Sequence, residues 1–435
     1  SRGFTPVSTV LGDVAIFGDH FFPAWLVYAP VFWLDGSGST LIVIQALNLA
    51  CTAPVVFLIA RGRGASSLVA AVLGLMSGLS FGLQSGAFFD AHTLTMGMGF
   101  LAWGLWAIEM RRWWLATVML VMFSGFKESL GLYVFALGVY VVVSELTAGR
   151  KDLRAVAFGA AWAVYGAAWF VLVIRVLMPM QAQLGTPPVS HETYQEFGPS
   201  VTEAAFGVMS RPLTAMWFMF SSEPKLASII VTFAGVGWLC LGSPLTLFVA
   251  GAPLFAERFL SSKASMWEMG YHYAAPLSVY AAWAAARAVP RAERWFSPVA
   301  VSVFLALSAV GTLQYGYKHP SNFLVWEYGY YARAGDAETQ RRAIARLREV
   351  AGPEGRIAAQ NRLLPHVAFR QHIWRLGEHD KADWVLLAEG RDAWPYDARY
   401  PARLRRQLLA AGTWTEAFAE DGVVILGRTS SLGPK

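Results

Sequence analysis

Long apolar runs separated by short polar turns dominate the first three quarters of the chain. A membrane-spanning helix needs roughly 20 apolar residues, and stretches such as LIVIQALNLACTAPVVFLIA and AVAFGAAWAVYGAAWFVLVI have that length. The pattern predicts ten membrane helices, approximately over 40–60, 66–86, 93–110, 113–126, 128–148, 155–178, 226–242, 244–259, 270–289 and 297–315. Segments 113–126 and 244–259 are short, which indicates tilted pairs, half-helices or re-entrant segments.

Three regions lie outside these runs. Residues 1–39 contain one short apolar segment, HFFPAWLVYAPVFWL, and are predicted to form a loop with an interfacial helix. No signal peptide or complete span is visible there, so we expect a preceding helix to be absent from this sequence. Residues 179–225 mix Pro, Gly and amphipathic stretches, which is typical of helices lying on a membrane surface.

The residues after about 316 predict a separate soluble domain over 317–435. GDAETQRRAIARLREV has helical periodicity and ends at Gly352-Pro353. Strand-like RIAAQ, ADWVLLA and GVVILG then alternate with helical NRLLPHVAFR and ARYPARLRRQLLAAG, which indicates a small α/β unit. No glycine-rich phosphate loop accompanies them, so nucleotide binding is not supported. No nucleic-acid partner is predicted.

Composition supports the membrane assignment, since 55% of the 435 residues are hydrophobic and 15% are charged. Soluble domains are nearer a quarter charged. The fold class predicted is therefore an all-α polytopic membrane protein with a small C-terminal α/β domain.

Basic residues indicate the orientation. They concentrate in the predicted turns RGRG (61–64), RR (111–112), GRKDLR (149–154) and RAVPRAER (287–294), all on one side of the bundle. The positive-inside rule makes this side cytoplasmic. Residues 1–39, the 179–225 loop and the C-terminal domain then lie outside, which in a bacterial inner membrane is the periplasmic side.

Four turns bring ionisable or aromatic polar residues to the predicted outer face: Asp19 and His20, Asp90 and His92, Lys127 and Glu128, and Glu268 with Tyr271, His272 and Tyr273. Such residues near a membrane are costly and usually functional or paired. Each turn also has an ordinary interpretation, as a helix cap at Asp90, an interfacial ion pair at Lys127 or an aromatic belt around His272. Their gathering on one face favours a functional cleft. A transporter would instead bind near the midplane, and a channel would carry polar residues along several spans.

The motifs GDHFFPAWLVYAPVFWL, FFDAHTLTM, FKESLGLYVFALGVYVV, YHYAAPL and RIAAQNRLLPHVAFR resemble an uncharacterised family of bacterial polytopic membrane proteins, a domain of unknown function. That family is grouped with the GT-C membrane glycosyltransferases. Two positions depart from its pattern: Ser129 replaces an acid after Lys127-Glu128, and Thr93-Leu94 replaces Pro-Glu after the Asp-x-His turn.

The resemblance implies transfer of a sugar from a polyprenyl-phosphate donor to an acceptor at the outer face. Asp19 would act as general base or metal ligand beside His20, while Asp90 and His92 would orient the acceptor or a metal. Lys127, fixed by Glu128, would bind phosphate, and His272, with Tyr271, would contact the donor. Asp19 and Asp90 could bind Mg²⁺ or Mn²⁺, which prefer oxygen ligands. The tail residues Asn361, His366 and Arg370 (with Pro365) match the family and would cover the cleft.

Two other functions remain open. The departures from the motif and the 18 tryptophans favour a catalytically inactive accessory subunit of a larger membrane complex, in which the α/β tail docks to other subunits. A transporter or flippase of a lipid-linked substrate is the third. Paired polar residues at mid-depth would favour it.

Overall fold

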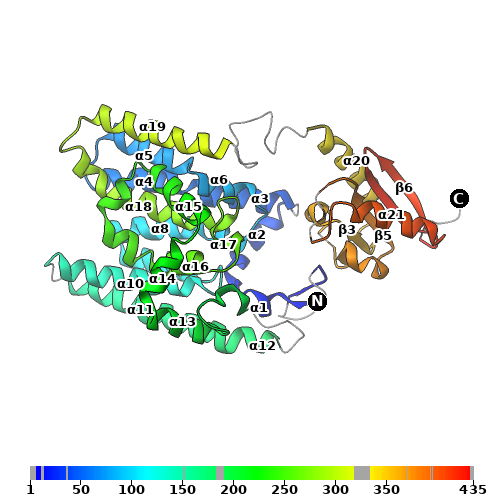
Figure 1. The fold of residues 1–435 in the computed structure, drawn as a ribbon, viewed down its shortest axis with the longest axis horizontal. Coiled ribbons are helices and arrows are strands. Elements are labelled where there is room, and N and C mark those ends of the chain that lie inside the picture. The colour runs from blue at the N-terminus through cyan, green and yellow to red at the C-terminus, as the bar shows by residue number, and fades with distance from the viewer. Residues whose placement is uncertain are drawn as a thin grey trace.

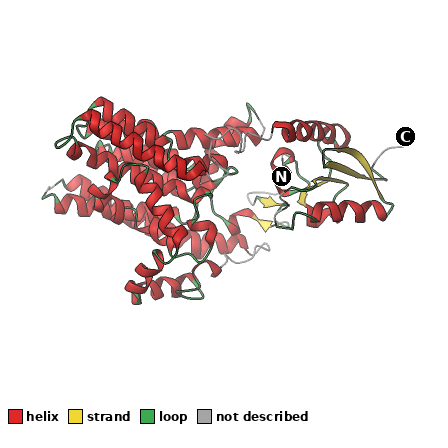
Figure 2. Cartoon of the chain, turned by 45° about the horizontal axis from the view of Figure 1, so that its top comes forward, coloured by secondary structure: helices red, strands yellow, loops and turns green. Residues whose placement is uncertain are grey.

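The computed structural model describes residues 6–10, 14–35, 38–149, 152–182, 191–317, 334–368, 370–391, 393 and 395–431. Helices form most of the chain up to residue 317, and a small domain containing a β-sheet begins at residue 334 (Figures 1 and 2). The chain starts with a short antiparallel pair, β1 (Val7–Ser8) and β2 (Val14–Ala15), which precedes the first helix.

The helical domain is built from many short elements. Up to residue 182 they are α1 (Ile16–Asp19), η1 (Pro23–Tyr28), α2 (Ala29–Phe32), α3 (Gly38–Ala50), α4 (Thr52–Gly62), α5 (Ser67–Gly78), α6 (Phe81–Phe88), α7 (Thr93–Met96), α8 (Met98–Glu109), α9 (Trp113–Ser124), α10 (Leu130–Thr147), α11 (Leu153–Leu172), η2 (Val173–Leu177) and α12 (Met178–Ala182). From residue 191 they are η3 (His191–Tyr194), α13 (Val201–Ser210), α14 (Pro212–Met219), α15 (Glu223–Ala234), η4 (Leu239–Gly242), η5 (Leu245–Val249), α16 (Ala252–Phe259), α17 (Ala264–Trp267), η6 (His272–Ala274), α18 (Ala275–Ala292) and α19 (Pro298–Tyr317).

The helical domain carries fewer long apolar helices than the ten predicted spans. Within the described residues, three are long and apolar enough to cross a membrane: Gly38–Gly62, Leu130–Thr147 and Leu153–Gln181. A fourth is reached if α5 and α6, bent by 40° at their junction, count as one. The other predicted spans are interrupted. For example, the chain between α15 and η4 turns through Gly237 and Trp238, both of which have positive φ.

Glycines allow helices α10 and α11 to pack closely against each other. A Cβ atom at Gly138 of α10 would lie 2.4 Å from the Gly159 carbonyl oxygen of α11, and one at Gly166 would lie 2.4 Å from the Gly131 carbonyl oxygen. Such contacts leave no room for a side chain, so both glycines are required for this packing. Small residues at helix interfaces are the usual way for membrane helices to approach each other closely.

The C-terminal domain has three layers, with its sheet between two helices. The strands are β3 (Ile357–Ala359), β4 (Ile373–Arg375), β5 (Trp384–Ala388), β6 (Trp414–Glu420) and β7 (Val423–Arg428), in the order β4-β3-β5-β7-β6. The β4-β3-β5 part is parallel and the β5-β7-β6 part is antiparallel. Alternate residues of β5 face opposite sides: Leu386 packs with α20 (Ala334–Ala351) and Leu387 with α21 (Tyr400–Ala410).

The predicted elements of this domain agree with the structure, with two omissions. The three predicted strands correspond to β3, β5 and β7, and the outer two predicted helices to α20 and α21. NRLLPHVAFR forms a 3₁₀ segment, η8 (Asn361–Val367), because Pro365 lies inside it. A second such segment, η9 (Leu376–Lys381), follows β4. The sequence did not predict β4 and β6.

The two ends of the helical domain differ in charge. The α10–α11 turn and the α18–α19 turn, both in predicted basic segments, lie at the end far from the C-terminal domain (Figure 1). The N-terminal segment lies at the opposite end, where Val10 packs against the hydrophobic core of the C-terminal domain. This arrangement agrees with the predicted grouping of the segments into two faces.

Candidate functional site

All four predicted turns contribute side chains that meet at the end of the bundle nearest the C-terminal domain. The first contact joins α1 to the turn before α10. The Nδ1 atom of His20, which follows α1, lies 3.1 Å from Oε1 of Glu128. The backbone N–H of Phe21 donates to the other carboxylate oxygen at 3.3 Å. The N-terminal segment is thereby tied to the start of a long apolar helix.

Lys127 is buried, and its partner is a residue that the sequence did not predict. Its Nζ atom donates to Oε1 of Glu257 on α16 at 2.8 Å. The hydroxyls of Ser129 and Tyr133 also donate to this carboxylate, at 2.9 and 2.8 Å. Glu128 therefore acts on Lys127 through its charge, whereas the lysine donates its hydrogen bond to Glu257. The missing acid at Ser129 is replaced by a hydroxyl that binds the acid on α16.

A buried glutamine organises the Asp90–His92 turn. The side-chain amide of Gln45 on α3 donates to the carbonyls of Gly86 and Phe89 at 2.9 and 3.0 Å. Its oxygen accepts the backbone N–H of His92 at 2.9 Å. The cap of α7 is His92, whose Nδ1 accepts from Leu94 N–H at 3.3 Å, so the capping role predicted for Asp90 is wrong. Asp90 itself is exposed.

His92 and His272 stack on each other, with ring centroids 3.5 Å apart and planes at 28°. Phe89 covers His272 at 4.5 Å and Tyr271 at 6.0 Å. Tyr273 lies beneath Lys127, with Nζ 5.4 Å from its ring centre. His272 is 3% exposed, yet among the described residues neither of its ring nitrogens has a hydrogen-bond partner. An orphaned buried imidazole of this kind requires an explanation.

We use the name histidine–lysine cluster for the six side chains of His20, His92, Lys127, Glu128, Glu257 and His272. They come from five different parts of the chain, and electrostatic interactions link Lys127 with each of the three histidines. Lys127 and the two glutamates have opposite charges. The cluster therefore holds one buried cation between two carboxylates, beside a pair of imidazoles.

Asp19 and Asp90 lie at the edge of this cluster. Asp19 is half-buried and interacts electrostatically with His20 and Tyr273. Its carboxylate has no hydrogen bond or ion pair within the described part of the chain. Asp90 interacts electrostatically with His366 of the C-terminal domain, so this part of the tail motif faces the Asp-x-His turn.

The other two predicted tail residues, Asn361 and Arg370, lie within the C-terminal domain. Asn361 begins η8 and is half-buried. The Arg370 guanidinium donates to the carbonyls of Val367, Gly352 and Gly355 at 3.1, 3.2 and 3.1 Å. Arg370 thus stabilises its own domain. Only His366 of the predicted motif residues is placed toward the helical domain by a described interaction.

The described residues do not themselves form a metal centre. No group of three or more His, Cys, Asp or Glu side chains in the described ranges is arranged to hold an ion. The predicted ligands Asp19 and Asp90 have different electrostatic neighbours, His20 and His366. Binding of Mg²⁺ or Mn²⁺ by these two carboxylates stays a prediction.

Arg258, the neighbour of Glu257, holds the His272 segment in place. The residue is 1% exposed, and its guanidinium donates to the carbonyls of Tyr273 and Trp267, both at 3.2 Å. It also donates to the Ser228 hydroxyl at 2.6 Å. Arg258 therefore connects α15 and α16 to the chain on both sides of His272.

Replacing Arg258 with methionine is expected to destabilise the protein by at least about 1.5 kcal/mol, because buried acceptors lose a charged donor. The measurement is the free energy of unfolding in detergent. Arg346→Met is the control, since Arg346 forms an exposed pair with Glu349 on α20 and such pairs contribute about 0–1 kcal/mol. Equal losses for the two variants would contradict this role.

Stability is expected to depend on the charge of His20. Burial lowers the pKa of His20, but the hydrogen bond and the negative charge of Glu128 outweigh burial, so the net pKa is above its ordinary value of 6.5. The stabilisation is fully present below pH 6.5 and is lost as the pH rises through the raised pKa. The wild-type melting temperature should therefore fall more steeply from pH 6 to pH 9 than that of His20→Gln. Parallel curves would exclude this contribution.

Sequence reasoning missed three important residues: Gln45, Glu257 and Arg258. Each is a polar residue inside a predicted apolar span. Such residues are expensive in a membrane and usually mark functional or pairing positions. That signal was present in the sequence at all three positions.

Comparisons with known proteins identify one family and two similar solved structures. A family model described as "Predicted membrane protein (DUF2079)" matches residues 1–425. Among solved structures, the chain is similar to ArnT from Cupriavidus metallidurans bound to undecaprenyl phosphate, with 13% identity, a TM-score of 0.49, and coverage of 96% of this chain and 90% of that one. The chain is also similar to ArnT from Cupriavidus metallidurans in the apo state, with 12% identity and a TM-score of 0.48. That match covers 96% of this chain and 89% of that one. A search of curated proteins finds no significant match.

Proposed function

We propose that the chain, which belongs to the DUF2079 family of predicted membrane proteins, is a GT-C-like glycosyltransferase. It would move a sugar from a polyprenyl-phosphate donor to an acceptor at the outer face of a bacterial inner membrane. The observation that carries the proposal is the placement of a carboxylate, Asp19, and an imidazole, His272, around buried Lys127, neither of which has a hydrogen-bond partner among the described residues. This is the set of groups that glycosyl transfer from a lipid phosphate needs.

The chemistry assigns one task to each side of the cluster. Asp19 accepts the proton of an acceptor hydroxyl as that oxygen attacks the anomeric carbon. The bond from this carbon to the phosphate oxygen breaks, and the polyprenyl phosphate leaves with the electron pair. Lys127 and His272 stabilise its developing negative charge. Asp90 and His366 face each other near the turn that would receive the acceptor.

The membrane arrangement is part of the same proposal. The bent pair α5–α6 and shorter apolar helices such as α9 would add further crossings to the three long spans. Large apolar side chains exposed on these helices, among them Trp114, Val118 and Val164, would contact lipid. The C-terminal domain would then lie in the periplasm, above the histidine–lysine cluster.

The test is a transfer assay with the full chain in lipid nanodiscs. Polyprenyl-phosphate-linked sugars (hexose, pentose and N-acetylhexosamine) are incubated with the protein and a cell-envelope extract as the acceptor source. Release of polyprenyl phosphate by the wild type is expected, with a large loss in Lys127→Met and little loss in Glu196→Gln, an exposed position of the 179–225 segment. No release from any donor, together with no binding of polyprenyl phosphate, would overturn the proposal.

A second function, an inactive accessory subunit of a membrane complex, is favoured by one observation. Lys127 pairs with Glu257, and His20 pairs with Glu128, so these charged groups already have partners within the protein. Such pairs stabilise a scaffold without a substrate. Gentle purification from native membranes separates the two functions, because a subunit would elute with fixed partners and stay inert toward every donor.

A further inference from the structure

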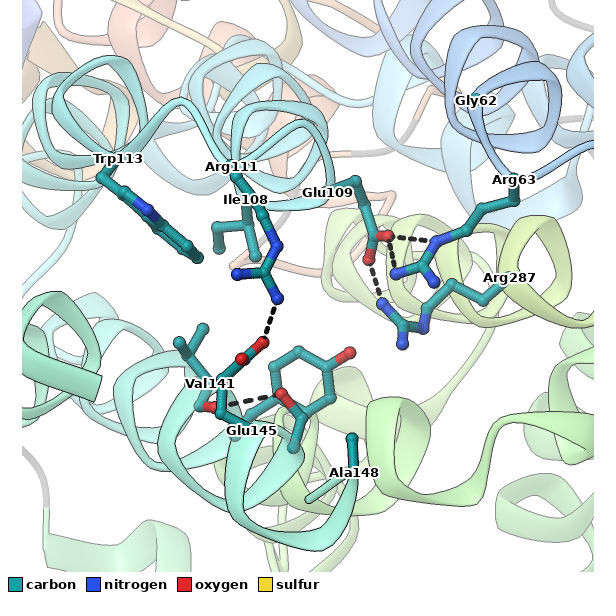
Figure 3. Close-up of a pocket in the computed structure, with 12 residues that line it drawn as sticks. Gly62, Arg63, Ile108, Glu109, Arg111, Trp113, Val141, Glu145, Ala148 and Arg287 are labelled. Carbon is teal, nitrogen blue, oxygen red and sulfur yellow. Dashed lines mark hydrogen bonds and ion pairs between the residues drawn. The ribbon is translucent and has the colours of Figure 1, made fainter. Parts of the chain in front are cut away.

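A polar cavity of about 240 Å³ lies at the end of the bundle that carries the basic turns. Residues from the ends of α4, α8 and α10, the start of α9 and one position of α18 line it (Figure 3). They include three arginines, two glutamates and two aromatic residues: Arg63, Arg111, Arg287, Glu109, Glu145, Trp113 and Tyr140. The lining thus carries more positive than negative charge, with both signs present.

This cavity is separate from the histidine–lysine cluster. Glu128 lies just before α10, and Glu145 lies in the last turn of the same helix. A rise of 1.5 Å per residue places the two positions about 25 Å apart. That distance is close to the thickness of the bilayer core, roughly 30 Å. The cavity therefore lies at the other membrane–water interface.

On the Glu109 side of the cavity, Arg63 and Arg287 have N–H groups that can donate to a ligand. The side chain of Glu109 is fully buried and accepts hydrogen bonds from Arg63, Arg287 and the indole N–H of Trp283. Arg63 uses Nε and Nη2 for this bond, and Arg287 uses Nη1. Within the described residues, Nη1 of Arg63 and Nη2 of Arg287 make no hydrogen bond. Two guanidinium groups thus offer N–H donors on the Glu109 side of the cavity.

The opposite wall offers an acceptor. Glu145 is 5% exposed, and its Oε1 atom accepts from Arg111 at 2.5 Å. Its Oε2 atom is buried and has no partner among the described residues. A buried carboxylate oxygen without a donor is costly. Figure 3 shows Glu145 and Arg111 on one side, with Glu109, Arg63 and Arg287 on the other.

We propose that this cavity binds a zwitterionic group that carries a phosphate and a primary ammonium, as in the headgroup of phosphatidylethanolamine. The phosphate accepts from Arg63 and Arg287, because guanidinium groups match phosphate oxygens. The ammonium donates to Oε2 of Glu145 and lies near the rings of Trp113 and Tyr140, which favour cations. A phosphate alone leaves the glutamate oxygen unpaired, and an amine alone leaves the arginines without an acceptor.

The size of the cavity agrees with this ligand. A cavity needs only about 10–15 Å³ to hold one water molecule, so about 240 Å³ leaves room for a small polar headgroup. The position at a membrane interface favours a lipid headgroup over a free metabolite, since lipid headgroups are concentrated there. The same chemistry in soluble form is O-phosphoethanolamine, which the experiment tests separately.

The experiment measures the melting temperature of the full chain in detergent with four probes. They are dioleoyl phosphatidylethanolamine, dioleoyl phosphatidylcholine, dioleoyl phosphatidylglycerol and free O-phosphoethanolamine. We expect the first to raise the melting temperature most, because the choline headgroup has no N–H donor and the glycerol headgroup has no cation. A larger shift with O-phosphoethanolamine than with the lipid would assign the site to a soluble ligand of the same chemistry.

Two variants test the assignment of the ammonium to Glu145, one at the site and one as a control. Glu145→Gln removes the negative charge that attracts the ammonium and should abolish the preference for phosphatidylethanolamine over phosphatidylglycerol. Asp152→Asn removes the charge of the other partner of Arg111. Asp152 lies outside the cavity lining, so this variant should keep the preference. Equal shifts for all lipids, no shift with any probe, or a preference that survives in Glu145→Gln would overturn the proposal and indicate a water-filled ion-pair network.

Discussion

Lys127→Met is expected to lower the free energy of unfolding by about 3–5 kcal/mol, the usual cost of removing one partner of a buried ion pair. Lys127 and Glu257 have side-chain exposures of 7% and 17%, and their charged atoms are 2.8 Å apart. Without the lysine, the side-chain donors left to the Glu257 carboxylate among the described residues are the hydroxyls of Ser129 and Tyr133. The measurement is denaturant unfolding in a fixed detergent.

The double variant Lys127→Met/Glu257→Gln separates structure from chemistry. Replacing both members of a buried pair by neutral groups is often close to neutral in stability, and glutamine still accepts from Ser129 and Tyr133. We therefore expect stability to recover while sugar transfer stays lost, because the donor phosphate has lost its cation. Recovery of both properties would show that the pair is structural and would support the accessory-subunit function.

A matched control uses the C-terminal domain. Lys381 forms an i,i+3 pair with Glu378 whose members are 41% and 29% exposed. Such an exposed pair contributes about 0–1 kcal/mol, so Lys381→Met should change stability little. If Lys381→Met and Lys127→Met are equally stable, burial of Lys127 does not have the assigned effect.

The hydrophobic pattern predicted the general architecture because burial and periodicity are local properties of a sequence. The helical domain, the short 113–126 segment and the strands β3, β5 and β7 were visible in this way. The pattern did not predict where apolar runs break. Those breaks depend on local backbone conformation and on packing, as in the positive φ of Trp238. The three-residue strand β4 is too short to produce a pattern of its own.

The candidate site shows a similar limit. The sequence placed Lys127, Glu128 and the histidines on one face, and the structure brings His20, His92 and His272 together with Lys127. The sequence did not identify Glu257 as the partner of Lys127, because two residues 130 positions apart in the chain leave no local pattern. The sequence analysis took Lys127 and its neighbour Glu128 as partners. In the structure Lys127 pairs with Glu257 on α16, and Glu128 pairs with His20 after α1. The bond from Gln45 to the His92 turn was hidden for the same reason.

Asp19→Asn is the second variant with a large expected effect, and it should act on the reaction and leave folding unchanged. A general base contributes roughly 100- to 10,000-fold to a rate, and asparagine has no basic oxygen, so sugar transfer should fall by a factor in this range. Because Asp19 has no hydrogen bond or ion pair to any described residue, the melting temperature should stay within about 1 °C of wild type, as expected for ΔΔG within ±0.5 kcal/mol. The readouts are the initial rate of polyprenyl phosphate release and the melting curve, with Glu196→Gln as the control carboxylate. Full activity in Asp19→Asn would remove the base from the mechanism, whereas a large loss of stability would show that this carboxylate is required for folding.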